Sequence, residues 1–220
     1  MPSMITARMP HPLRGLAKRA AGWREADAGV AAVEFALILP LMVSLFFGLS
    51  EVTLAINMDR KLTLLSRSLA DLSSRVSDLP TAELANVFAA SSAIMRPYDS
   101  STTQMVVSSV VVTQNGSTYT GAVEWSCGKN IAAKKQTETQ AQYDANNLKV
   151  KAANSAEPVP AGFQSPTTKS FILVETLLPY TPVFGKFITG EIRMRESTPW
   201  PVRNNDKVKG PSPCPADPAS

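Results

Sequence analysis

The pattern of hydrophobic and polar positions begins with an uninterrupted apolar segment near the N-terminus. Residues 30–50 read VAAVEFALILPLMVSLFFGLS, and Glu34 is the one charge among them. At about 1.5 Å per residue, a helix of this length spans roughly 30 Å, the thickness of the hydrocarbon core of a bilayer. Because the segment is apolar on every side, it predicts a transmembrane helix rather than a helix in a soluble core.

Beyond this span the apolar positions become periodic. Leucine and valine recur at intervals of three and four residues, at Leu62, Leu65, Leu69, Leu72, Val76 and Leu79. This spacing predicts an amphipathic extension of the same helix over residues 51–79. Pro80 disfavours helix at the residue before it, so we expect one helix of about fifty residues, from near Val30 to near Asp78. The stripe is short for a coiled coil, and self-packing on the chain's own sheet is favoured over a partner helix.

The next segments predict a small domain over residues 81–198. Residues 81–95 predict a second helix with Thr81 as its N-cap. Residues 104–114 and 117–127 are extended and rich in β-branched side chains. Asn115-Gly116 between them is the strongest short hairpin turn, because both residues accept positive φ. Trp125 in the second of these strands is expected to cover the sheet.

The remaining segments complete an antiparallel sheet. Residues 128–160 are polar and predict an exposed loop, with a helical turn or two around 136–148. Strands are expected at 168–178 and 190–196, joined through a turn at Pro179, Tyr180 and Pro182. The apolar patch 183–188 either packs on the sheet or lies near the membrane. We expect the Pro-rich tail, residues 199–220, to be disordered apart from any tie through Cys214. The expected fold class is α+β: a long N-terminal helix followed by a small antiparallel sheet.

The charges ahead of the span predict its orientation. The N-terminal leader carries Arg8, Arg14, Lys18, Arg19 and Arg24, opposed by Glu25 and Asp27. By the positive-inside rule, this flank stays in the cytoplasm and the C-terminal body is exported to the periplasm. The chain carries a net charge of +4, but it has no basic face or motif that predicts nucleic-acid binding. A Sec-type signal peptide is disfavoured, because the apolar run exceeds the usual length of about 7–15 residues and no A-x-A site follows.

The cysteines and the other reactive side chains limit the reactions and the ligands that the sequence predicts. Cys127 and Cys214 fit an oxidising compartment, where they either form a disulfide or remain two unrelated thiols. The single histidine, His11, lies in the leader, and there is no metal-binding cluster, nucleophile elbow or P-loop. No obvious partner is seen for the carboxylates of the predicted strands, which are Glu124, Glu175, Glu191 and Glu196. We therefore expect neither an enzyme nor a bound cofactor or metal.

The junction between leader and span resembles the processing site of type IV pilin-like precursors. It reads Gly29-Val30-Ala31-Ala32-Val33-Glu34. In that family a membrane aspartyl peptidase, the prepilin peptidase, cuts after the glycine, and the glutamate becomes the fifth mature residue. The longer run GVAAVEFALILPL, residues 29–41, is similar to the start of the TadE/TadG-like minor pilins, or pseudopilins, of the tight-adherence (Flp) pilus. A strand, a proline-aromatic turn and a short basic strand near the end are also similar to TadE-type proteins.

This resemblance implies a processing site at Gly29 and Val30, which would remove residues 1–29. It also implies that Glu34 faces the terminal amine of a neighbouring subunit. A carboxylate in hydrocarbon costs about 2–3 kcal/mol, so a charge pair that forms only at the correct stagger would fix the assembly register. The other interpretation is that Glu34 lies near the headgroups and snorkels.

The expected partners follow from the same resemblance. They are other pilin and pseudopilin subunits, the prepilin peptidase, the inner-membrane assembly platform and the lipid bilayer. The expected location is the bacterial inner membrane, which the chain crosses once. Whether the protein is also incorporated in a pilus stays open. The alternative is an uncleaved single-span membrane protein whose exported domain binds a partner or ligand, and an exported enzyme is a third interpretation.

Overall fold

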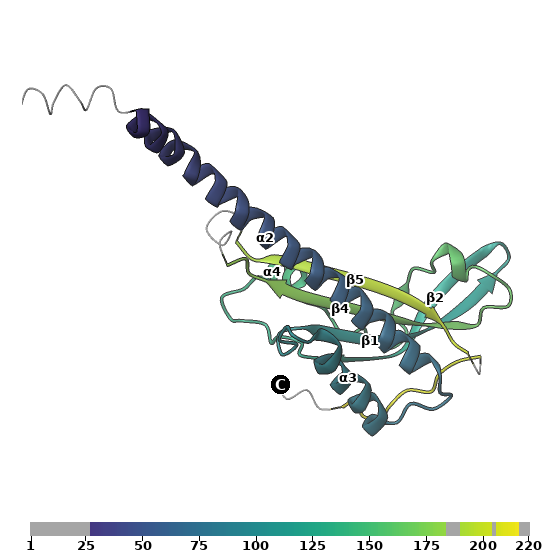
Figure 1. Ribbon diagram of the computed structural model, residues 1–220. Coiled ribbons are helices and arrows are strands. Elements are labelled where there is room, and N and C mark those ends of the chain that lie inside the picture. The colour runs from purple at the N-terminus through teal and green to yellow at the C-terminus, as the bar shows by residue number, and fades with distance from the viewer. Residues whose placement is uncertain (1–26, 184–189, 204–205, 216–220) are drawn as a thin grey trace, which may run out of the picture. The chain divides into compact units, whose positions relative to one another are not determined.

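The computed structural model describes residues 27–183, 190–203 and 206–215 (Figure 1). It confirms the expected fold class, because a long N-terminal helix is followed by a five-stranded antiparallel sheet. The chain divides after Ser50 into a helical segment and a domain that begins at Glu51. The tail of the predicted apolar patch, residues 184–188, lies outside the described residues.

The first described helix, α2, runs from Asp27 to Ser74 and contains Pro40. It ends four residues earlier than expected, because the C-terminal tail offers the backbone other partners. The amide of Arg203 donates to the carbonyl of Ser74 at 3.3 Å, and the amide of Leu79 donates to Lys209 at 2.9 Å. Asp78 therefore lies in a short parallel bridge with Lys209 rather than in the helix.

The apolar stripe of α2 packs on the chain's own sheet, as the sequence predicts. Leu62, Leu65 and Leu69 are at most 1% exposed and belong to one core cluster. The sheet contributes Met105, Val107, Ile172, Val174 and Leu178 to this cluster. The exception is Leu72, which is 36% exposed.

The second helix, α3, spans Thr81–Met95 and adds Leu84, Phe88 and Met95 to the same core. The predicted cap is wrong, because the N-cap residue is Pro80 and no side chain caps the helix. The hydroxyl of Thr81 instead donates to the carbonyl of Pro213 at 2.6 Å. This contact is one of several that hold the C-terminal tail against the domain.

The sheet has the strand order β3-β2-β1-β4-β5, and every pair is antiparallel. The strands are β1 (Gln104–Asn115), β2 (Thr118–Lys129), β3 (Ala156–Glu157), β4 (Ser170–Tyr180) and β5 (Ile192–Pro201). The β1–β2 hairpin is present, but its two-residue loop is Gly116-Ser117, since Asn115 pairs with Thr118. Gly116 has φ +62°, a conformation that glycine adopts without strain.

Strand β4 is longer than the sequence predicts and includes part of the expected turn. Pro179 and Tyr180 lie in the strand and pair with Arg193 and Ile192 of β5. The β1 strand reaches only as far as Leu177 of β4. Beyond that point β4 has a neighbour on one side, so a residue without a backbone N–H is tolerated there.

The predicted disorder after residue 199 is wrong for the part that the structure describes. Strand β5 continues to Pro201, and Val208 is fully buried in the main core. The predicted loop 128–160 does hold a short helix, α4 (Gln140–Asn146), and a 3₁₀ turn, η1 (Ala161–Phe163), follows it. The loop is not wholly exposed, because Leu148 packs with Val106 and Leu177 on the opposite face of the sheet.

Candidate functional site

The apolar half of α2 is the first candidate site, because most of its side chains are exposed. Its large apolar side chains are exposed, for example Leu37 at 75% and Leu41 at 69%. Among the described residues, α2 is the one helix long and apolar enough to cross a membrane, with a mean hydropathy of 2.3 and none of that window buried. This helix is suited to a single membrane span.

Uncharged polar groups in this segment are satisfied within the helix itself. The hydroxyl of Ser44 donates to the carbonyl of Leu41, and that of Ser50 donates to Phe46, both at 2.9 Å. Side-chain bonds of this kind let a hydroxyl enter hydrocarbon without leaving a donor unpaired. Glu34 differs from these residues, because an ionised carboxylate cannot be neutralised by the backbone of its own helix.

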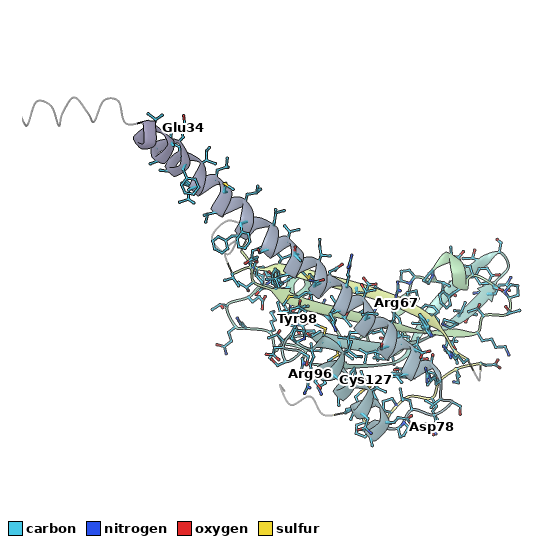
Figure 2. All side chains as sticks on the ribbon, viewed as in Figure 1. Glu34, Arg67, Asp78, Arg96, Tyr98 and Cys127 are labelled. Carbon is cyan, nitrogen blue, oxygen red and sulfur yellow. A yellow bond between two sulfur atoms is a disulfide. The ribbon has the colours of Figure 1, made fainter. Side chains whose placement is uncertain are left out.

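The predicted processing residues lie in the first turns of α2. The helix begins at Asp27, so Gly29 and Val30 are already helical. Nothing lies within 4 Å of the position where a Cβ on Gly29 would stand, and Val30 is 60% exposed. Figure 2 marks Glu34 near this end of α2. Four residues separate Val30 from Glu34, about 6 Å along the helix and on the same face. Cleavage and the register role stay predictions.

A second carboxylate, Glu51, begins the domain and was not singled out by the sequence analysis. Its side chain is 9% exposed. It accepts a hydrogen bond of 2.7 Å from the hydroxyl of Tyr180 and one of 2.8 Å from the amide of Val183. Burial raises the pKa of the Tyr180 phenol to about 12, and the hydrogen bond to Glu51 adds to the shift.

The sequence does indicate that Glu51 faces the interior of the domain. Counting back from Leu62 along the stripe gives positions 58, 55 and 51, which continue the spacing of three and four residues. Glu51 therefore occupies an inward position of the amphipathic helix, where an apolar residue is expected. An acidic residue at such a position requires buried hydrogen-bond donors. The donors could not be identified, because they lie about 130 residues further along the chain.

The two cysteines form a disulfide in the structure. Cys127 of β2 and Cys214 of the tail are bonded, with their Cα atoms 5.6 Å apart. Trp125, two residues earlier in the strand, packs against the main core and donates its indole N–H to the carbonyl of Val208 at 2.8 Å. The sheet is thus joined to the tail by a covalent bond and by a side-chain hydrogen bond.

Three of the four carboxylates that the sequence placed in strands have ion-pair partners, which corrects the expectation of isolated charges for these three. Glu124 pairs with Lys207, and Glu191 pairs with Arg193. Glu175 shares Lys151 with Glu157, at 3.0 and 2.8 Å. Burial lowers the pKa of Lys151, but the hydrogen bonds to these two carboxylates outweigh burial and raise the pKa overall. The pairs of Glu124 and Lys151 join separate segments, whereas Glu191 and Arg193 lie two residues apart. In each pair the carboxylate is bound to a cation.

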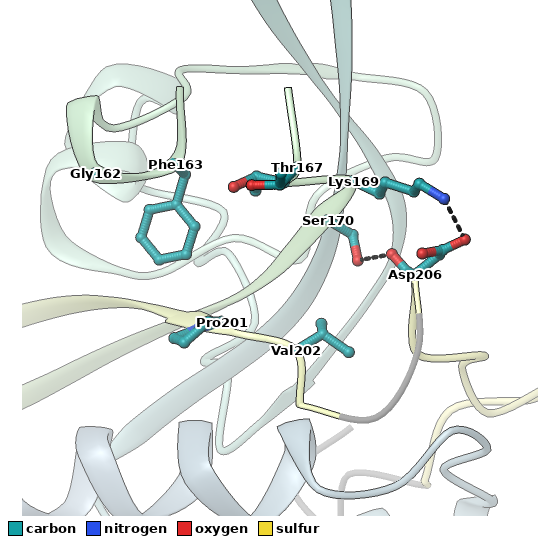
Figure 3. Close-up of a pocket in the computed structure, with 9 residues that line it drawn as sticks. Gly162, Phe163, Thr167, Lys169, Ser170, Pro201, Val202 and Asp206 are labelled. Atoms are coloured by element: carbon teal, nitrogen blue, oxygen red, sulfur yellow. Dashed lines mark hydrogen bonds and ion pairs between the residues drawn. The ribbon is translucent and has the colours of Figure 1, made fainter. Parts of the chain in front are cut away.

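One hollow of the domain brings together an ion pair and a serine hydroxyl. One cavity of about 260 Å³ lies beside the start of β4 and the end of β5 (Figure 3). There Lys169 pairs with Asp206 at 2.6 Å, and the hydroxyl of Ser170 donates to the backbone carbonyl of Asp206 at 2.5 Å. The serine has no base beside it, and its proton is already engaged. Across the described residues, no group of three or more His, Cys, Asp or Glu could hold a metal ion.

Comparison with known proteins identifies one segment. Residues 29–71 match the family model described as TadE-like protein. The matched segment lies entirely within α2, so the match concerns the apolar helix and the start of its amphipathic extension. No curated protein and no solved structure gives a significant match to the chain.

Proposed function

We propose that this TadE-like protein is a minor pilin, or pseudopilin, that takes part in the assembly of a tight-adherence pilus. Residues 30–50 anchor it in the bacterial inner membrane, and the α+β domain lies on the periplasmic side. Its role is structural and non-catalytic. Its partners are other pilin and pseudopilin subunits, the prepilin peptidase and the inner-membrane assembly platform.

One observation carries this proposal. Glu34 is the only charge in residues 29–50 and follows Gly29 by five positions, within the segment that matches the TadE-like family. The helix around it is exposed and apolar, so nothing within this segment of the chain compensates the carboxylate. A general membrane anchor gains nothing from such a charge, which costs about 2–3 kcal/mol on insertion.

Cleavage after Gly29 supplies the missing counter-charge. The new N-terminus is the amine of Val30, which is positively charged at neutral pH. Within one subunit, the amine and Glu34 are separated by one turn of helix. Between two subunits, a stagger of one turn brings the amine of one beside the carboxylate of the other. A neighbour in any other register leaves both charges without an intersubunit partner in hydrocarbon, so the pair selects the register more than it adds stability.

Processing is tested by the Gly29→Arg variant in cells that contain the matching prepilin peptidase. Wild-type protein should lose its 29-residue leader, and N-terminal sequencing should begin at Val30. The variant should retain the leader and migrate more slowly. Recovery of wild-type protein from membranes with an intact N-terminus, in the presence of a competent peptidase, would favour an uncleaved single-span protein instead.

The role of Glu34 is tested by Glu34→Val, with Glu34→Asp as the matched control that keeps the charge. Both variants should insert in the membrane and be processed, because the rest of the span and the residues at the cleavage position are unchanged. Pilus output should fall strongly in Glu34→Val and less in Glu34→Asp. Equal pilus output in wild type and Glu34→Val would refute the register role while leaving membrane anchoring intact.

A further inference from the structure

The end of the domain that begins at Glu51 exposes an unusual number of large apolar side chains. Val52, Leu54 and Ile56 of α2 are 55%, 41% and 48% exposed. At the β4–β5 end of the sheet, Val183 is 70% and Ile192 is 39% exposed. We call these five the juxtamembrane residues. Elsewhere in the described part of the domain, the exposed large apolar side chains are Leu64, Leu72 and Val150.

The β4–β5 end of the sheet is held at the first residue of the domain. The Glu51 carboxylate accepts one hydrogen bond from the Tyr180 hydroxyl at 2.7 Å and one from the Val183 amide at 2.8 Å. Ile192 is paired with Tyr180 across the two strands. Two segments that are far apart in the sequence, the start of the domain and the β4–β5 corner, are thus joined by one buried carboxylate.

Connectivity places this corner at the bilayer surface. Glu51 follows Ser50 directly in α2, and Ser50 is the last residue of the proposed span. Ile56 is six residues from Ser50, about 9 Å along the helix. The headgroup region of a bilayer extends about 5–8 Å beyond the hydrocarbon on each side. The groups bonded to Glu51 therefore lie within or beside that region, whatever the angle between span and domain.

We propose that the juxtamembrane residues form a surface that rests on the lipid bilayer, and that Glu51 holds the β4–β5 corner there. The occupant of this surface is the interfacial region of the bilayer, where exposed apolar side chains are favoured and water-soluble domains gain by burying them. The anchor side chain is suited to this place, because its charge is satisfied by two donors and is withdrawn from lipid. This inference rests on the proposed membrane anchoring by residues 30–50.

This surface would fix the orientation of the domain while the subunit is in the membrane. A domain tethered by a helix alone is free to tilt, whereas a second contact restricts its orientation. The restricted domain would present the same face to arriving subunits. Extraction of the subunit from the membrane would expose the juxtamembrane residues to water, so the contact favours the membrane-bound state.

The test places a fluorescent probe at the surface. Full-length Val183→Cys, labelled with an environment-sensitive dye, is reconstituted in vesicles of phosphatidylethanolamine and phosphatidylglycerol that contain lipids spin-labelled near the headgroup. The native cysteines remain joined, so the new thiol is the reactive one. Val150→Cys is the matched control, because Val150 is also exposed and apolar, at 47%, but is not part of the β4–β5 corner.

We expect strong quenching and a blue-shifted emission at position 183, and neither at position 150. Equal quenching at the two positions would overturn the proposal. Quenching at 183 that disappears on dilution of the protein in lipid, together with cross-linking between two copies through this position, would assign the surface to another subunit and would also overturn it.

The Glu51 anchor is tested in the same labelled protein. Glu51→Ala removes both hydrogen bonds and should reduce quenching at 183 to the level seen at 150. Glu51→Gln keeps an acceptor oxygen and should retain most of it. Unchanged quenching in Glu51→Ala would overturn the anchoring role, provided that protease resistance shows the domain to be folded. Because these measurements need neither peptidase nor pilus machinery, they are independent of whether Gly29 is processed or pili are made.

Discussion

The indole N–H of Trp125 donates to the carbonyl oxygen of Val208 at 2.8 Å. The two residues are 83 positions apart. Val208 is fully buried, and Trp125 packs against the same core. The C-terminal tail is therefore a structural part of the domain, and its side chains and backbone complete a core that the helices and sheet leave open.

The close approach of the tail to Trp125 makes Gly210 sensitive to substitution. A Cβ at this position would lie 2.2 Å from Cγ of the Trp125 ring. Gly210→Ala should therefore destabilise the domain by about 1–3 kcal/mol, since either the ring or the tail must move. Denaturant unfolding of the full chain in detergent micelles, followed by tryptophan fluorescence, measures this loss.

Gly162→Ala provides the matched control for Gly210→Ala. No heavy atom lies within 4 Å of the position of its Cβ, and φ at Gly162 is not in the left-handed region. Its free energy of unfolding should stay within about 0.5 kcal/mol of wild type. Equal stability of the two variants would mean that the tail does not lie against Trp125.

The disulfide gives a prediction of its own. Replacing Cys127 and Cys214 together by alanine should lower the free energy of unfolding by about 2–4 kcal/mol, because the bond constrains the unfolded chain across 87 residues. Urea unfolding in micelles, with and without reductant, measures the effect. Reductant should destabilise wild type by a similar amount and leave the double variant unchanged. A wild type that is insensitive to reductant would contradict the prediction.

Tyr180 gives a prediction about alkaline pH. Its pKa is raised from 10.0 to about 12 in the folded domain, chiefly by burial and then by the bond to Glu51. The folded state thus holds the proton more tightly than the unfolded state. The stabilisation is fully present below pH 10 and is lost as pH rises from about 10 to 12. Absorbance at the phenolate band should show one tyrosine that titrates late, and Tyr180→Phe should remove this late step.

The shared lysine of the sheet gives a fourth prediction. The Lys151 side chain is 18% exposed and joins Glu157 and Glu175. Lys151→Ala leaves two partly buried carboxylates without their cation and should cost about 1–3 kcal/mol at neutral pH. Thermal unfolding at neutral pH measures this loss.

Lys149→Ala is the control for Lys151→Ala. Lys149 binds Asp144 at 2.5 Å, but its side chain is 50% exposed. An exposed ion pair contributes at most about 1 kcal/mol, so this variant should be less destabilised than Lys151→Ala. If the two variants lose the same stability, burial of the Lys151 network is not what makes it stabilising.

The parts of the fold that could be predicted are those with short-range patterns. The apolar span, the stripe from Leu62 to Leu69 and the β1–β2 hairpin each follow from residues close in sequence. The end of α2 at Ser74 could not be predicted, because the backbone groups that replace the helical bonds come from Arg203 and Lys209. The ordered tail was missed for the same reason, since its proline content indicates disorder when its distant contacts are unknown.

The candidate site residues also divide into those that neighbouring residues predict and those that depend on distant contacts. Gly29, Val30 and Glu34 form a local motif, and the TadE-like match lies over it. Glu51 was missed although it continues the helical stripe, because its donors belong to Tyr180 and Val183. The prolines around Tyr180 favoured a turn. Tyr180 is instead the last residue of β4, and its hydroxyl binds Glu51 at the start of the domain.

The disulfide between β2 and the tail also orders events during biosynthesis. Cys127 emerges from the ribosome 87 residues before Cys214, a delay of roughly 4–17 s at about 5–20 residues per second. Until Cys214 has been made, the thiol of Cys127 has no partner, and any oxidant present can join it to a thiol of another molecule. Covalent closure of the domain must therefore follow translation of nearly all of it. Under the proposed export of the domain, the rate at which folded protein accumulates should depend on the thiol oxidase and isomerase of the cell envelope.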